Sequence, residues 1–225
     1  MAMIGVVGGS GPQGRGLAYR FARGGHDVIL GSRDADRASV AAQELKDRLH
    51  EEPSGATGAV SGATNADAAE LAEIVLLAVP FSGQDDLIAD LAPHLRGKVV
   101  ISCVNSLGFD RQGPYGLDLG PTSAAENAQR LLPGSTLVGA FHHLSAVTLS
   151  SGESLAHEDI LVCGDDPAGK ETVMELAVSV TGKPGVDAGP LRLARHLEPW
   201  TAVLISVNKK YKVRSGVALT GLPQR

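Results

Sequence analysis

A glycine-rich turn lies near the start of the chain, directly after an apolar stretch. The turn reads Gly9-Ser10-Gly11-Pro12-Gln13-Gly14, and residues 3–8 form the apolar stretch. The order of strand, tight turn and helix start makes this G-x-G-x-x-G pattern specific: the first glycine permits the turn, the second admits a pyrophosphate, and the third lets helix and strand pack closely. The amides of residues 10–14 would face the ligand from a helix N-terminus, which carries about half a positive charge. The turn therefore predicts a dinucleotide site that includes Gly9, Gly11 and Gly14.

Composition argues against several other classes of protein. The net charge is −5, and basic residues are scattered apart from a cluster at 209–214, so no nucleic-acid footprint is present. The longest apolar runs, such as 74–79 and 99–101, are far shorter than the roughly 20 residues that cross a bilayer. No basic segment precedes the glycine turn, so we predict no signal peptide. We expect a cytoplasmic protein with neither nucleic-acid nor membrane partners.

The rest of the chain alternates short apolar runs with helical patterns, which indicates an α/β fold. The runs are continuously apolar, as in a parallel sheet covered on both faces. Loops are expected at 51–58, at 105–121, which is rich in Gly and Pro, and at 146–158. The longest helical pattern, 191–211, is the one credible separate module. We therefore expect a main domain at 1–190, with a loop insertion at about 146–158, and a small C-terminal helical segment at 191–225.

Strand two ends in Gly31-Ser32-Arg33, where NAD-binding folds carry an acidic residue and NADP-binding folds an arginine. Arg33 can donate two hydrogen bonds to phosphate oxygens, and Arg37 follows one helical turn later. Ser32 adds a hydroxyl. In an alternative interpretation, both arginines form a solvated face paired with nearby aspartates, worth under about 1 kcal/mol. The pattern favours NADP.

The cysteines and an acidic pair carry no sign of a metal site. Cys103 and Cys163 lie in apolar runs without metal-type spacing, so we predict buried, reduced thiols. Asp165 and Asp166 are adjacent but have no third ligand nearby, which favours a turn and helix cap. We expect no metal.

Several motifs together resemble those of a known family, the NADPH-dependent reductases of the deazaflavin coenzyme F420, also called F420H2:NADP oxidoreductases. The resemblance runs almost end to end. The motifs that carry it are Gly8-Gly9-Ser10-Gly11, Gly31-Ser32-Arg33 with Arg37, Ala78-Val79-Pro80-Phe81, Val162-Cys163-Gly164-Asp165-Asp166 and Asp187-Ala188-Gly189-Pro190-Leu191. The last two are the more specific, because many dinucleotide-binding proteins share the first.

The resemblance implies a Rossmann-type, doubly wound, mainly parallel sheet with a small C-terminal portion, assembled as a homodimer. It implies hydride transfer between C4 of the nicotinamide of NADP(H) and C5 of F420, with both rings in one cleft. By similarity, the NADP contacts fall on Ser10, Gly11, Pro12, Gln13, Ser32, Arg33, Arg37, Val79, Asn105 and Ala146. The deazaflavin would meet the nicotinamide at His142 and Leu144, and the segment 191–225 would contribute to the deazaflavin site and the dimer. Positions 143–145 read His-Leu-Ser where the family pattern is Thr-Ile-Pro, so the resemblance does not define the shape of this wall.

Hydride transfer between two bound cofactors requires proximity and orientation rather than an acid/base pair. The chain has no Tyr-x-x-x-Lys arrangement near the strand ends. We therefore assign no catalytic residue. His142, at the end of a strand, is interpreted as a positioning residue, with proton donation as the alternative. The basic cluster at 209–214 either attracts the anionic tail of F420 or stabilises a helix end. Leu191, Leu197, Trp200, Leu204 and Val207 are interpreted as helix core or dimer contacts.

Two other functions remain open at this point. One is an NADPH-dependent reductase of a small imine, ketone or keto acid, which would need an acid/base residue. The other is a non-catalytic NADP(H) sensor that reports the nucleotide ratio to a partner.

The nucleotide preference yields a first prediction. We expect Arg33→Ala to cost about 1.5–3 kcal/mol of NADPH binding, the range for charge-assisted hydrogen bonds, and to leave NADH binding nearly unchanged. Titration of both nucleotides against the variant measures this difference. An equal loss for NADPH and NADH would contradict the phosphate role of Arg33.

Overall fold

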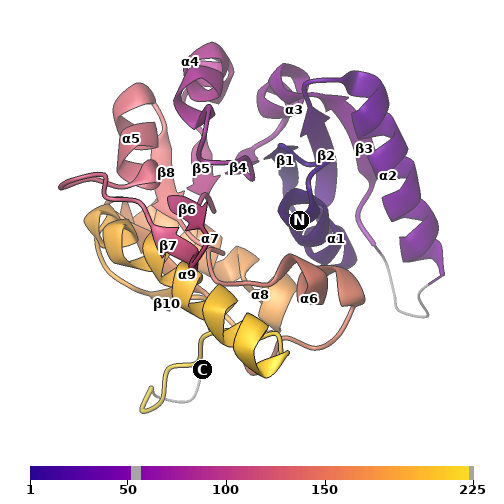
Figure 1. Ribbon diagram of the computed structural model, residues 1–225. Helices are drawn as coiled ribbons and strands as arrows, with labels where there is room; N and C mark the ends of the chain where they lie inside the picture. Colours follow the sequence, from indigo (N-terminus) through magenta and orange to yellow (C-terminus); the bar gives the residue numbers. More distant parts are fainter. Residues whose placement is uncertain (52–56, 223–225) are drawn as a thin grey trace.

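One twisted sheet organises the molecule. The computed structural model describes residues 1–51 and 57–222, so most of the loop expected at 51–58 lies outside the described residues. The described strands of the main sheet are arranged in the order β10-β9-β8-β5-β4-β1-β2-β3 (Figure 1). Their bounds are β1 Met3–Val7, β2 Asp27–Ser32, β3 Val60–Thr64, β4 Ile74–Leu77, β5 Val99–Ser102, β8 Thr136–Gly139, β9 Leu161–Gly164 and β10 Val186–Asp187. Neighbouring strands are parallel except for β8 and β9, which confirms a mainly parallel sheet.

Helices cover both faces of this sheet, so it has two cores. The described helices are α1 Pro12–Arg23, α2 Ala35–His50, α3 Asn65–Leu71, α4 Gln84–Leu95, α5 Ala124–Leu131, α6 Ala146–Ser151, α7 Pro167–Leu176, α8 Val178–Thr181 and α9 Ala194–Tyr211, the last preceded by a 3-10 turn at Leu191–Leu193. Leu17 and Phe21 of α1 pack with α2, α6, α7 and α8 on one face. Ile88 of α4 and Leu197 of α9 pack with α3 and α5 on the other. This arrangement is the expected doubly wound, Rossmann-type fold. No helix in the described ranges is long and apolar enough to cross a membrane.

Two segments expected as loops contain regular structure. Within 105–121, β6 Leu107–Asp110 and β7 Gly113–Gly116 form an antiparallel hairpin. Its turn is held by Asp110, whose carboxylate accepts the Gln112 and Gly113 amides at 2.8 and 3.1 Å. The hairpin lies against α9 (Figure 1), so closely that a Cβ on Gly116 would come within 2.5 Å of the Pro199 side chain. The hairpin is supported by this contact with a distant helix. The Gly and Pro residues of the segment 105–121 therefore predict a loop and do not reveal the hairpin.

The loop expected at 146–158 begins instead with the short helix α6, which a buried arginine holds in place. Arg20 of α1 donates to the carbonyl oxygens of Thr148, Leu149 and Glu153 at 2.7–2.9 Å. A cation at the carboxyl end of a helix also interacts favourably with the helix dipole. Burial, followed by the neighbouring Arg23 and Arg48, lowers the pKa of Arg20 to about 10, so it stays charged at neutral pH. Arg20 therefore joins α1 to α6.

Removing this cation tests its structural role. We expect Arg20→Met to lower the free energy of unfolding by about 2–4 kcal/mol, because it leaves buried carbonyl groups without donors. Urea denaturation measures the change. Arg15→Met is the matched control on the same helix, since it removes only the half-exposed ion pair with Glu44 and should cost under about 1 kcal/mol. Similar losses for both variants would show that the buried contacts of Arg20 contribute little.

Candidate functional site

The candidate site lies where the order of strands reverses. β1 and β4 are neighbours, but β2 and β3 follow on one side while β5 and β8 follow on the other. In open α/β sheets ligands bind outside the carboxyl ends of the strands at this point. Two adjoining cavities of about 470 and 500 Å³ open there and share Gly11, Ala78, Val79 and Pro80 as a common wall. The crevice therefore accommodates one long ligand or two ligands side by side.

The glycine turn after β1 contributes Gly11 to this common wall. Gly8 has a φ of 77°, and its amide donates to the Asn65 side chain at 3.1 Å. A Cβ on Gly14 would lie 2.8 Å from the Gly8 carbonyl oxygen and 2.9 Å from the Gly9 Cα, so only glycine lets α1 start against the turn. The N-cap of α1 is Gly11, which has no side chain to bond the first helical amides. These amides stay available to an anion, as a pyrophosphate cradle requires.

Ser32, Arg33 and Arg37 line the larger cavity together with Ser10, and the Ser10 hydroxyl donates to the Ser32 oxygen at 3.4 Å. Asp34 does not pair with the arginines. Its carboxylate caps α2 by accepting the Asp36 and Arg37 amides at 2.9 and 3.3 Å. Within the described residues, neither Arg33 nor Arg37 forms an ion pair. Two exposed, uncompensated guanidinium groups beside a serine fit a phosphate monoester, which favours the phosphate interpretation over the solvated face.

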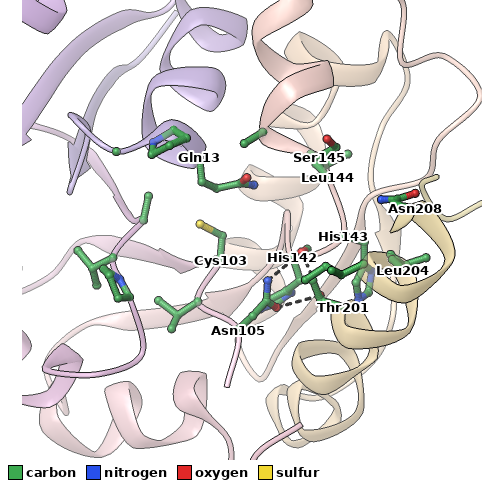
Figure 2. A pocket seen from close by; sticks show the side chains of 18 of the residues that line it. Gln13, Cys103, Asn105, His142, His143, Leu144, Ser145, Thr201, Leu204 and Asn208 are labelled. Carbon is green, nitrogen blue, oxygen red and sulfur yellow. Dashed lines mark hydrogen bonds between the residues drawn. The ribbon is translucent and has the colours of Figure 1, made fainter. Parts of the chain in front are cut away.

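The smaller cavity is bounded by a network that joins three distant segments (Figure 2). The Asn105 amide nitrogen donates to the His142 carbonyl oxygen at 3.0 Å. The Thr201 hydroxyl, on α9, lies 3.1 Å from the Asn105 side-chain oxygen and 3.2 Å from the same carbonyl oxygen. The carboxyl ends of β5 and β8 and the C-terminal helix thus meet at one point of the cavity wall.

The backbone is strained just before this point. Phe141 has a φ of 64°, in the left-handed region that bulky residues rarely adopt. Its ring packs edge-on against the Phe21 ring, with the two ring centroids 5.7 Å apart. Its carbonyl oxygen lies 3.5 Å from the side-chain nitrogen of Gln13. The sharp turn at Phe141 directs the following residues, 142–146, along the cavity.

His142 is buried, and neither of its ring nitrogens has a hydrogen-bond partner in the described parts of the chain. Burial, followed by the nearby His143, lowers the pKa of His142 to about 3. Burial also lowers the pKa of His143, whose Nε2 donates to the Leu197 carbonyl oxygen at 2.7 Å. His142 is therefore a neutral ring across the physiological pH range, which favours a positioning role over proton donation.

The two cysteines are buried, and one member of the acidic pair caps a helix. Both thiols are free and buried, and burial raises the pKa of Cys103 and of Cys163 to about 12, so Cys103 is an uncharged part of the cavity wall. Asp166 caps α7 by accepting the Gly169 amide at 2.6 Å. Among the residues that the structure describes, no group of His, Cys, Asp or Glu is arranged to hold a metal ion.

The crevice brings together most of the residues named from sequence. The smaller cavity includes Pro12, Gln13, Asn105, His142, Leu144 and Ala146; the larger includes Ser10, Ser32, Arg33 and Arg37; Gly11 and Val79 line both. Gly9 and Gly14 belong to the glycine turn but line neither cavity.

The sequence predicts that the segment 191–225 contributes to the deazaflavin site, but sequence reasoning missed which of its residues line the cavity. Thr201, Leu204, Asn208 and Ser215 line the smaller cavity, although Leu204 was assigned to helix core or dimer contacts. Asn208 accepts from both the amide and the hydroxyl of Ser215 at 2.6 and 2.8 Å, which folds the chain back after the helix. The one available signal was Thr201, a polar residue at helical spacing between Leu197 and Leu204.

Comparisons with known proteins agree with this geometry. Residues 3–106 match the family model described as NADP oxidoreductase, coenzyme F420-dependent. The F420-dependent NADP reductase of Methanothermobacter thermautotrophicus is 37% identical over 99% of this chain and 96% of its own length. That of Methanocaldococcus jannaschii is 34% identical over 97% of this chain and 98% of its own length.

A solved structure agrees as well. The crystal structure assigned to an F420-dependent NADP reductase from Arthrobacter sp. FB24 superposes with a TM-score of 0.80 at 27% identity, covering 98% of this chain and 99% of the other. Similarity over nearly the whole length, in sequence and in fold, shows that the chain belongs to the family of F420-dependent NADP reductases.

Proposed function

We propose that the protein transfers a hydride between NADP(H) and coenzyme F420 in a reversible reaction. In one direction NADPH, a proton and oxidised F420 give NADP⁺ and reduced F420. The observation that carries this proposal is the pair of adjoining cavities, one bearing the uncompensated Arg33 and Arg37 and the other walled by uncharged groups. Membership of the family supplies the identity of the second cofactor.

The NADP contacts follow the crevice from end to end. The 2′-phosphate binds at Ser32, Arg33 and Arg37, and the pyrophosphate lies against the glycine turn, from Gly9 to Gly14. The amides that face it are those of Gln13 and Gly14 at the start of α1, because the Gly9 and Gly11 amides donate to backbone carbonyls and Pro12 has no amide hydrogen. The nicotinamide then reaches the smaller cavity. Val79, Asn105 and Ala146 contact it there, and Pro12 and Gln13 line the same cavity.

The deazaflavin ring binds against His142 and Leu144, in the part of the smaller cavity that α9 closes. Both His142 and Leu144 line this cavity. Leu144 and Leu204 supply apolar contact. Because His142 is neutral and Cys103 stays protonated, neither group places a charge beside the two rings.

Catalysis in this site consists of orientation. When both cofactors are bound, the nicotinamide supplies the hydride and the deazaflavin accepts it. Alignment of two bound reactants reaches effective molarities of about 10⁵ M or more. The residues of the cleft hold the rings and exclude water, so no side chain has to act as an acid or base and none is assigned as catalytic.

We also propose the organisation around this site. Residues 1–190 act as the NADP-binding domain, and 191–225 complete the deazaflavin site and contribute to a homodimer that works in the cytoplasm; residues 223–225 of this segment lie outside the described ranges. Trp200, Val203 and Tyr211 support the dimer, since these large side chains of α9 are exposed.

A spectroscopic assay tests the proposed reaction. We expect NADPH to bleach the absorption of oxidised F420 when the protein is present, and reduced F420 with NADP⁺ to restore it. Because Arg33 and Arg37 select the nucleotide, NADH should support far less turnover. The same mixture without the protein is the control.

The two alternative functions give different results in this assay. Turnover of a small imine or ketone without turnover of F420 would indicate the other class of reductase. NADPH binding with no turnover of either substrate would indicate a sensor. Each of these results would reject the proposed reaction.

His142 provides a second test. We expect His142→Ala to raise the KM for F420 about tenfold, equivalent to about 1.4 kcal/mol, because the ring forms part of the wall. The pH dependence of the rate from pH 5 to 8 should keep its wild-type shape, since a group with a pKa of about 3 does not titrate there.

Steady-state kinetics across this pH range measure both effects. His196→Ala, an exposed histidine of α9, is the matched control and should change neither the KM nor the pH profile. A pH limb that disappears in His142→Ala alone would contradict the positioning role and indicate proton transfer by His142.

A further inference from the structure

A buried carboxylate on α9 lies beneath the site and takes no part in the contacts described so far. Glu198 is 0% exposed. Its two oxygens accept the Ala124 and Ala125 amides at 2.9 and 3.0 Å and the Ser106 hydroxyl at 3.1 Å. The carboxylate thus caps the N-terminus of α5 from a different helix and at the same time holds the loop that follows β5.

These contacts are directly connected to the cavity wall. Ser106 follows Asn105 in the chain, and Thr201 lies one helical turn after Glu198, on the same side of α9. Thr201 and Asn105 in turn approach within 3.1 Å of each other. Two adjacent residues of the loop and two residues of the helix therefore form a closed ring. Asn105 and Thr201 line the cavity, whereas Ser106 and Glu198 do not.

The ring fixes the orientation of the Asn105 amide. Its oxygen accepts from Thr201, and its nitrogen donates one hydrogen to the His142 carbonyl oxygen at 3.0 Å. An amide nitrogen has two hydrogens. The second is left for a ligand in the cavity that Asn105 lines.

We propose that Glu198 is a positioning residue for hydride transfer, because its carboxylate holds the loop after β5 and helix α9 in the register that orients Asn105 toward the bound cofactors. The inference rests on the proposed function. It goes beyond that function by assigning a role to a side chain that touches neither cofactor.

The groups around Glu198 make this positioning sensitive to pH. Burial raises the pKa of Glu198 to about 7, although the three donors favour the ionised form. Two titratable groups on other elements face Glu198. From α5 this is Glu126, whose carboxylate oxygens accept two hydrogen bonds from the Arg195 guanidinium at 2.7 and 2.5 Å. From β9 it is the thiol of Cys163, which stays protonated. Below about pH 7 the Glu198 carboxylate becomes protonated and loses the negative charge that binds two amides and a hydroxyl. The closed ring of contacts therefore weakens as pH falls.

The experiment compares Glu198→Gln with wild type, with both cofactors saturating, from pH 5.5 to 8.5. We expect the wild-type kcat to fall below about pH 7. The variant should show a kcat about tenfold lower at pH 8 and no such limb, while its Kd for NADPH stays within twofold because the phosphate contacts are remote. Glu126→Gln is the matched control at the same interface, and it should retain both the kcat within twofold and the limb.

A second variant and a second readout complete the test. Ser106→Ala removes only the bond from the loop to the carboxylate, and we expect a kcat about threefold lower at unchanged NADPH affinity; if Glu198→Gln does not fold, this variant decides. Trp200, the one tryptophan of the chain, lies two residues from Glu198, and its ring centroid lies 5.1 Å from that of His143. Its fluorescence in the free protein should change with a midpoint near pH 7 in wild type and not in Glu198→Gln.

The outcomes separate this inference from the proposed function. A wild-type protein that does not turn over F420 refutes the proposed function, and the Trp200 titration then still tests the role of Glu198. Wild-type turnover with an unchanged kcat and pH limb in Glu198→Gln overturns the inference. Equal losses of kcat, NADPH affinity and thermal stability in that variant also overturn it, since they indicate a structural role alone.

Discussion

The parallel pairing of β1 with β4 is the constraint on which the rest of the structure depends. The chain winds away from these two strands in opposite directions, so no connection covers the carboxyl ends between them. The glycine turn, Val79 and the segments after β5 and β8 therefore face a single crevice, although they are far apart in sequence. Helix α9 closes the crevice from the other side, and the hairpin of β6 and β7 packs against that helix (Figure 1).

Charge is distributed unevenly along this crevice. One end carries two exposed arginines, and the neighbouring Asp34 is engaged in capping α2. The other end carries groups that are polar but uncharged, because burial keeps His142 neutral and Cys103 protonated. Phosphate binding at one end and orientation at the other are compatible within a single cleft, since hydride transfer needs aligned rings and no ionised side chain between them.

The parts of this account that sequence predicts are those with local causes. Gly14 is required by contacts within six residues, and Arg33 follows directly from the end of β2. The hairpin after β5, the helix α6 and the network at Thr201 depend on contacts between segments about forty to more than a hundred residues apart, so no local pattern reveals them. Glu198 is a clear example, because on its own helix it resembles any surface glutamate, and only the approach of α5 and Ser106 buries it.

In the proposed reaction the hydride passes directly between two cofactors held in one cleft. The most direct test uses NADPH that carries deuterium at the transferable C4 position, together with oxidised F420, in ordinary water. We expect the deuterium to appear at C5 of reduced F420 without loss to solvent, and the transfer step to be slower with deuterium than with hydrogen. Deuterium found in the solvent, or reduced F420 that carries only hydrogen, would contradict direct transfer and require a proton-exchanging group that the cleft does not contain among its described residues.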